Sequence, residues 1–154
     1  MTELIEEAKW DLLTAGWTPD RVYDISQYEE YYIKNGYVIN DVIRNALRNF
    51  GGLHFTTPTV NKEGKRASHF DAIMSLDNAC FHHTQVFEKY TDGPVLPIGE
   101  CSSGYVTTLM AHSGKMYGVY AGFYYIGDDI CDFINRLYIP EQWQEIIVPE
   151  MKFC

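Results

Sequence analysis

The chain has 154 residues, of which 21 are acidic and 12 are basic, so its formal net charge at pH 7 is -9. This charge argues against nucleic acid as a partner, because phosphate binding needs a positive surface. A hydrophobic share of 46% argues against a disordered chain. No apolar run is long enough to span a bilayer, and the acidic start lacks the features of a secretory signal. We therefore expect one cytoplasmic domain over residues 1–154.

Helical spacing of apolar residues predicts three helices in the first third of the chain. The first is capped by Thr2 and stopped by Gly16. The second covers residues 27–35 behind a Ser26 cap, and the third opens near Asn40. The third helix has an apolar stripe at i, i+3, i+4 and i+7, formed by Ile43, Ala46, Leu47 and Phe50.

From residue 53 onward the pattern changes to short strands. A polar turn is expected at 61–65, and the turn of the clearest hairpin is expected at 112–114. A helix capped by Ser75 is expected at 75–90. The predicted strands are 53–57, 68–73, 95–98, 105–111, 115–120 and 122–126.

Two further helices are expected at the C-terminal end. Asp128 or Gly127 opens the first, which extends to Leu137, and Pro140 begins the second at 141–148. Strands do not alternate regularly with helices along the chain, which argues against a doubly wound parallel sheet. The sequence predicts an α+β fold, with a mainly antiparallel sheet packed against N-terminal and C-terminal helices.

Two clusters of side chains offer candidate chemistry. Cys80 with His82 and His83 could serve a small hydrolase or transferase, although neighbours in sequence do not by themselves form a nucleophile–base pair. Metal binding could combine these histidines with His69 and Asp71. Adjacent histidines on a helix point about 100° apart, which is unsuitable for one metal ion. We expect no metal, no cofactor and no catalytic residues.

The four cysteines form no Cys-x-x-Cys pair, and their spacing matches no zinc pattern. Free thiols of this kind are typical of a reducing cytoplasm. The cysteines are Cys80, Cys101, Cys131 and Cys154.

An ordered series of short motifs crosses most of the chain. They are Ala-Gly-Trp-Thr-Pro-Asp-Arg at 15–21, Asn-Phe-Gly-Gly-Leu at 49–53, Leu-Pro-Ile-Gly-Glu at 96–100, Ser-Gly-Lys-Met-Tyr at 113–117 and the helix at 128–137. The series resembles the SUKH superfamily of bacterial immunity proteins, in particular its third subfamily. The resemblance covers roughly residues 4–138 and leaves 139–154 as a C-terminal extension. Residues 68–90 and the tail after 140 match no motif of the family.

The resemblance implies a SUKH-type fold and the role of a cytoplasmic antitoxin. Such proteins neutralise polymorphic toxins, which are often nucleases or nucleic-acid deaminases. The implied partner is a cognate toxin protein with a basic groove, which an acidic protein can occupy by mimicking phosphate charge. A general protein-binding adaptor is the alternative that the eukaryotic relatives of the family suggest.

We expect the partner-binding face to consist of exposed acids and aromatic residues near the sheet and the late loops. Asp128 and Asp129 could instead cap a helix, and each tyrosine could instead belong to the core or a strand surface. The predicted partner-binding residues are Glu100, Tyr105, Tyr124, Tyr125, Asp128 and Asp129, followed by Asp71 and Asp77.

Overall fold

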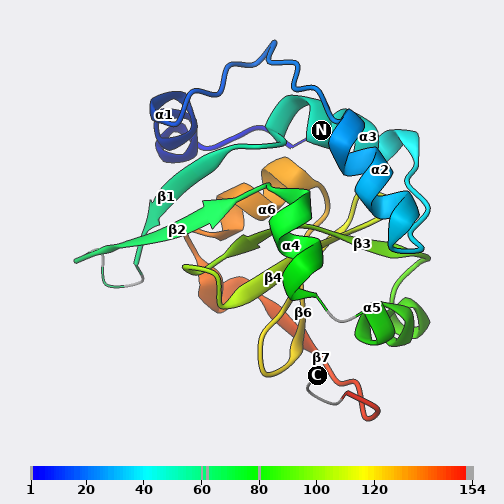
Figure 1. Cartoon of the computed structure of the whole chain (residues 1–154). Helices are drawn as coiled ribbons and strands as arrows, with labels where there is room; N and C mark the ends of the chain where they lie inside the picture. The colour runs from blue at the N-terminus through cyan, green and yellow to red at the C-terminus, as the bar shows by residue number, and fades with distance from the viewer. Residues whose placement is uncertain (1, 60, 62, 80, 152–154) are drawn as a thin grey trace.

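Seven strands form one antiparallel sheet in the described part of the computed structural model (Figure 1). The structure describes residues 2–59, 61, 63–79 and 81–151, with only the backbone at 81–83. Each strand pairs with the next one along the chain, so the sheet is a simple meander. The strands are β1 (His54–Pro58), β2 (Lys65–His69), β3 (Val95–Cys101), β4 (Val106–Ala111), β5 (Met116–Val119), β6 (Phe123–Gly127) and β7 (Gln144–Ile146).

Helices lie before, within and after the run of strands, which confirms the predicted α+β fold. Figure 1 shows α2 and α3 side by side at one end of the molecule, with α1 near β1. The helices are α1 (Glu6–Thr14), α2 (Ser26–Lys34), α3 (Asp41–Phe50), α4 (Ala72–Asn78), α5 (Phe81–Phe87) and α6 (Ile130–Arg136), with short 3-10 turns η1 (Glu88–Tyr90) and η2 (Pro140–Gln142).

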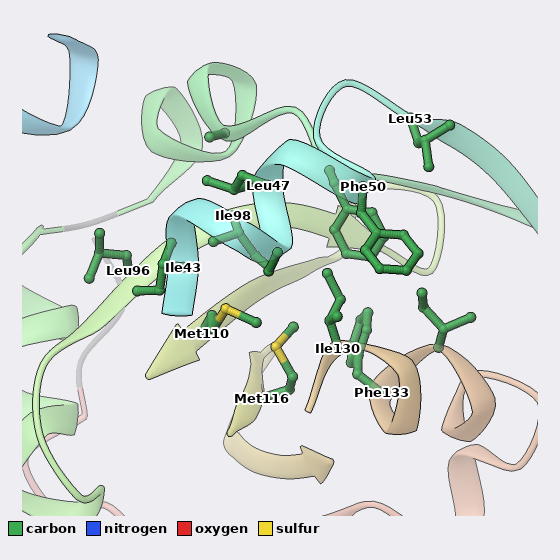
Figure 2. Close-up of a cluster of buried hydrophobic side chains, with 14 of the residues drawn as sticks. Ile43, Leu47, Phe50, Leu53, Leu96, Ile98, Met110, Met116, Ile130 and Phe133 are labelled. Atoms are coloured by element: carbon green, nitrogen blue, oxygen red, sulfur yellow. The ribbon is translucent and has the colours of Figure 1, made fainter. Parts of the chain in front are cut away.

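The main hydrophobic core lies between the helices and one face of the sheet. Asn40 caps α3 by accepting a hydrogen bond from the Ile43 backbone N–H at 3.1 Å, as the sequence predicts. All four residues of the predicted α3 stripe are buried. Figure 2 shows the α3 side chains packed towards Met110 and Met116 of the sheet, with Ile130 and Phe133 of α6 beside them. We call this side of the sheet the helical face.

A second, smaller core lies on the opposite face of the sheet. Side chains alternate along a strand, so Leu109 points away from Met110 and into this second core. Phe123 of β6 stacks on Phe87 of α5, with ring centroids 4.2 Å apart, and on Tyr117 of β5 at 5.2 Å. Partly buried side chains from the C-terminal end pack against this core, namely Ile146, Val148 and Met151.

The junction between β2 and β3 is narrow, because its register holds the single pair His69–Glu100. Gly99 permits this approach, since a Cβ on Gly99 would lie 2.0 Å from the His69 carbonyl oxygen. The Ser75 hydroxyl of α4 donates to the Gly99 carbonyl at 2.9 Å, which holds α4 against the same junction. The motif at 96–100 therefore joins two parts of the sheet.

Two predicted helix caps are wrong. The residue that caps α1 is Ile5, without a side-chain hydrogen bond, while Thr2 reaches across to Asp129. Ser26 is the first residue of α2, and its own backbone N–H is bonded to the Asp24 carboxylate at 3.0 Å. In both places the hydroxyl residue that was expected to cap lies beside an acidic side chain that accepts its hydrogen bond.

The segment between β2 and β3 also differs from the prediction. The predicted strand 68–73 is displaced towards the N-terminus, because β2 pairs with β1 from Lys65 onward and Asp71 already caps α4. The predicted single helix at 75–90 is divided into α4 and α5, and Ala79 between them has extended backbone angles. Ser75 is not a helix cap, because it lies inside α4, where its side chain is completely buried.

The predicted helix at 141–148 is wrong. Pro140 begins the 3-10 turn η2, and the chain then forms β7, which pairs with β6. Ile146 and Val148 both pack against the second core, and their spacing of two residues is that of a strand. The open edge of β6 therefore offers these residues better contacts than a helix would.

Candidate functional site

A groove with a cavity volume of about 490 Å³ opens at one end of the sheet. Its walls come from β2, the β3–β4 turn, the start of β4, the β5–β6 turn, β6 and η2 with the residue that follows it. The nine lining residues are Arg66, Ser102, Ser103, Tyr105, Val106, Tyr120, Tyr124, Pro140 and Trp143. Four of them are aromatic, and we call this feature the aromatic groove.

Two tyrosines project from the rim of the aromatic groove. Tyr105 precedes β4 and is 68% exposed, while Tyr120 follows β5 and is 54% exposed. Their rings meet edge to face, with centroids 5.8 Å apart and planes inclined by 69°. A tyrosine ring supplies a large, rigid contact area at low entropic cost, so an exposed pair of this kind suits the binding of another molecule.

Both turns that carry these tyrosines hold non-glycine residues in the left-handed region. The φ angles are 52° at Ser102, 58° at Ser103 and 50° at Ala121. The Ser103 backbone N–H donates to the Ala67 carbonyl at 2.9 Å, which ties the β3–β4 turn to β2. Left-handed backbone at non-glycine residues costs free energy and is concentrated at functional sites. Here the strained residues flank the exposed tyrosine pair.

The rear wall of the groove is built by Tyr124 and Trp143. Their ring centroids lie 6.4 Å apart, and the Trp143 indole N–H donates to the Arg136 carbonyl at 3.0 Å. Pro140 of η2 lines the groove beside them. The C-terminal segment that was predicted to be a helix therefore supplies one side of the groove.

Two of the predicted partner-binding residues, Tyr105 and Tyr124, lie together in the aromatic groove. Tyr125 follows Tyr124 on β6 and points to the other face of the sheet, where its hydroxyl donates to the Asp128 carboxylate. Burial, followed by this hydrogen bond, raises the pKa of Tyr125 to about 12. The Arg136 guanidinium lies 5.4 Å from the Tyr125 ring centre. Tyr125 and Asp128 are therefore engaged in contacts within the fold.

The other predicted aspartates make contacts within the fold. Asp129 caps α6 by accepting from the Asp132 backbone N–H at 2.8 Å, and it also accepts from Thr2. Asp71 caps α4 through its side chain, and Asp77 accepts a hydrogen bond from the Tyr31 hydroxyl. Their role in partner binding remains a prediction, and the structure places none of them in the aromatic groove.

The prediction of Glu100 as an exposed acid is wrong. Glu100 is only 5% exposed, and its carboxylate accepts from Asn78 at 3.0 Å. It also contacts His69 Nε2 at 2.9 Å. Because the Asp71 backbone N–H donates to His69 Nδ1 at 3.0 Å, Nε2 carries the proton and donates to Glu100. Glu100 therefore holds β2, β3 and α4 together.

We expect Glu100→Ala to lower the free energy of unfolding by about 3 kcal/mol, because His69 and Asn78 would each keep a buried or half-buried donor without an acceptor. Urea denaturation of the purified variant measures the loss. The control is Glu30→Ala on the exposed surface of α2, which should change stability by no more than about 0.5 kcal/mol. Equal losses in both variants would contradict the assigned role of Glu100.

The candidate catalytic cluster is only partly within the described residues. Cys80 lies outside them, and the side chains of His82 and His83 on α5 are likewise not described. Among the described residues, no three His, Cys, Asp or Glu side chains converge to hold a metal ion. Burial raises the pKa of the Cys101 thiol to about 12 and of the Cys131 thiol to about 11, so neither thiol ionises readily at neutral pH.

Sequence reasoning did not name Tyr120, Trp143 or Arg66 as members of a binding site, although all three line the aromatic groove. Tyr120 could have been found, because it ends a predicted strand directly before Ala121-Gly122 and therefore lies at a turn. Trp143 could not have been found, because the sequence predicts a helix at 141–148, whereas the backbone at Trp143 is in fact extended.

In the described segments no helix is both long enough and apolar enough to cross a membrane.

The seven-stranded meander with its covering helices defines an α+β protein of SUKH type. A family model described as SUKH-3 immunity protein matches residues 5–139. This match spans most of the chain, so the chain belongs to the SUKH-3 immunity protein family, as its motifs predict. Searches of curated proteins and of solved structures found no match. Pro140 and Trp143 lie just beyond the residues that match the family, and the rest of the aromatic groove lies within them.

Proposed function

We propose that the chain neutralises a cognate polymorphic toxin by direct contact, and that the aromatic groove is the contact surface. Membership of the immunity protein family supports the role. The observation that supports this contact surface is the exposed Tyr105–Tyr120 pair, which two turns with left-handed residues hold at the groove rim. Exposed aromatic residues around a concavity are a frequent centre of protein–protein binding energy.

The charge of the chain supports a basic partner. A net charge of -9 attracts a positively charged protein over a distance and speeds its encounter. Enzymes that act on nucleic acids need such positive surfaces for their substrates. In this proposal the toxin is a nuclease or a nucleic-acid deaminase, and the immunity protein covers its basic substrate groove.

The bacterial cytoplasm is the proposed place of action. Cys101 is a free, buried thiol, as expected in a reducing compartment. The toxin of such a system reaches the same compartment as its nucleic-acid substrate, so the immunity protein must meet it there.

The proposal assigns no catalytic step to the immunity protein, since steric blocking of the toxin requires none. A variant with both Cys80→Ala and His83→Ala should therefore protect cells as well as the unchanged chain does. Loss of protection in this folded variant would favour a Cys/His enzyme instead.

Complex formation tests the proposed function. We expect the toxin gene to lie beside the gene of this chain. The chain and a catalytically inactivated variant of that toxin domain are purified separately and mixed at micromolar concentration. We expect one co-eluting peak in gel filtration, together with loss of nuclease or deaminase activity when the active toxin is used. Two separate peaks with full toxin activity would refute the proposal.

A further inference from the structure

Arg66 is the single charged residue among the nine that line the aromatic groove. It lies on β2, where the alternation of the strand turns Arg66 to the helical face and Lys65 to the opposite one. The β3–β4 turn is held beside Arg66 by two bonds between Ser103 and Ala67, at 2.9 Å from the Ser103 N–H and at 3.2 Å to its hydroxyl. Arg66 therefore lines the groove beside the turn that leads to Tyr105.

Among the residues that the structure describes, Arg66 forms no ion pair, and Glu63 lines a shallow pocket with it at the β1–β2 turn without pairing. Other arginines do form ion pairs: Arg44 pairs with Glu29 and Asp41, and Arg136 pairs with Asp132. Arg21 and Arg48 form no ion pair either, but each donates a hydrogen bond to an asparagine, Arg21 to the Asn49 carbonyl at 2.9 Å and Arg48 to Asn45 Oδ1 at 3.3 Å. No hydrogen bond joins the Arg66 side chain to a residue that the structure describes. Its planar group presents paired N–H donors that match a carboxylate.

We infer that the aromatic groove takes an extended segment of the toxin whose apolar side chains lie against the tyrosines and Trp143, and whose carboxylate pairs with Arg66. The inference rests on the proposed function, because it specifies the part of the toxin that enters the groove. The apolar walls exclude water around the pair, which strengthens its hydrogen bonds relative to those of a fully solvated pair.

A local acid on the toxin is compatible with a basic toxin overall. The net charge of -9 acts on the approaching partner over roughly the Debye length, which is about 8 Å at physiological salt. The carboxylate meets Arg66 only after contact, at hydrogen-bond distance. Long-range attraction therefore sets how fast the proteins meet, and the Arg66 pair sets which segment enters the groove.

Charge reversal at Arg66 tests the inference, with calorimetry against the same inactivated toxin domain. Arg66→Glu should weaken binding by about 30-fold or more, because the partner carboxylate would face a like charge. Lys65→Glu is the matched control, since it changes the net charge equally from the exposed opposite face of β2. It should change binding by no more than about threefold, because it alters only the screened long-range attraction to the toxin.

Two milder variants, Arg66→Gln and Arg66→Lys, test the same residue with less risk of a folding defect. Thermal melting of each free variant shows whether it is folded. Arg66→Gln should lose about tenfold in affinity, and Arg66→Lys should retain part of it because a lysine keeps the charge without the paired donors. Equal effects of Arg66→Glu and Lys65→Glu would overturn the inference.

The inference and the proposed function can fail separately. If Tyr105→Ala weakens binding while Arg66→Glu binds as the unchanged chain does, the groove holds the toxin without a carboxylate, and only the inference fails. If neither variant changes the affinity, the groove is not the contact surface and both fail. A charge swap would identify the pair directly: an acidic toxin residue that pairs with Arg66 should, when replaced by lysine, restore binding to the Arg66→Glu variant.

Discussion

Gly99→Ala should lower the free energy of unfolding by about 3 kcal/mol or more, at the upper end of what overpacking costs. The added Cβ would lie 2.0 Å from the His69 carbonyl oxygen and 3.1 Å from the Phe70 Cα, and both neighbours are backbone that cannot rotate away. Strands β2 and β3 share one register pair, so their separation would also break the Glu100 contacts. Urea denaturation measures the loss.

Gly64→Ala is the control for Gly99→Ala. A Cβ on Gly64 would meet Thr59 at 3.6 Å, which is an ordinary contact, and the residue is exposed in the β1–β2 turn. Its stability should change by less than about 1 kcal/mol. If Gly99→Ala were equally mild, the close approach of β2 and β3 would not limit the stability of the fold.

The double variant Tyr105→Ala, Tyr120→Ala should bind the cognate toxin at least about 100-fold more weakly than the unchanged chain. The two rings form one exposed edge-to-face pair, so their removal takes away the most exposed aromatic side chains of the groove. Both side chains are more than half exposed, and their loss should leave the melting temperature nearly unchanged. Isothermal calorimetry with the inactive toxin domain gives the affinity.

The matched control removes two apolar side chains that are exposed elsewhere. Val22 is 82% exposed and Ile33 is 71% exposed, and neither lines the aromatic groove. Val22→Ala, Ile33→Ala should bind the toxin as the unchanged chain does. If this control lost as much affinity as the tyrosine variant, general surface hydrophobicity would account for binding and the groove would not.

The fold could be predicted where local spacing and tertiary packing agree. The α3 stripe is buried as predicted, because its apolar residues recur at helical spacing and Asn40 caps the first turn. The hairpin of β4 and β5 was predicted from two strand-like runs around a glycine turn. Strand β7 was not predicted, because its pairing with β6 is a long-range contact that outweighs the helical propensity of residues 141–148.

The candidate site could be predicted only in part. Residue type favours Tyr105 and Tyr124 correctly as members of one surface, whereas Glu100 shows the weakness of the same argument. An acid next to a strand can be exposed or can balance a buried histidine, and only the pairing of β2 with β3 decides between them. The convergence of β2, two turns and η2 on one groove is a property of the folded sheet that no local pattern carries.

Amide hydrogen exchange of the chain, alone and with the inactive toxin domain, tests most directly where the toxin binds. Apart from the Ser103 N–H, which bonds to Ala67 of β2, the groove turns are held by local bonds, such as Tyr105 N–H to Ser102 and Trp143 N–H to Pro140, so most of their amides should exchange readily in the free chain. On toxin binding we predict slower exchange at residues 102–106, 119–124 and 140–143. Slower exchange confined to the acidic segments 71–78 or 128–132, with the groove unchanged, would contradict the account.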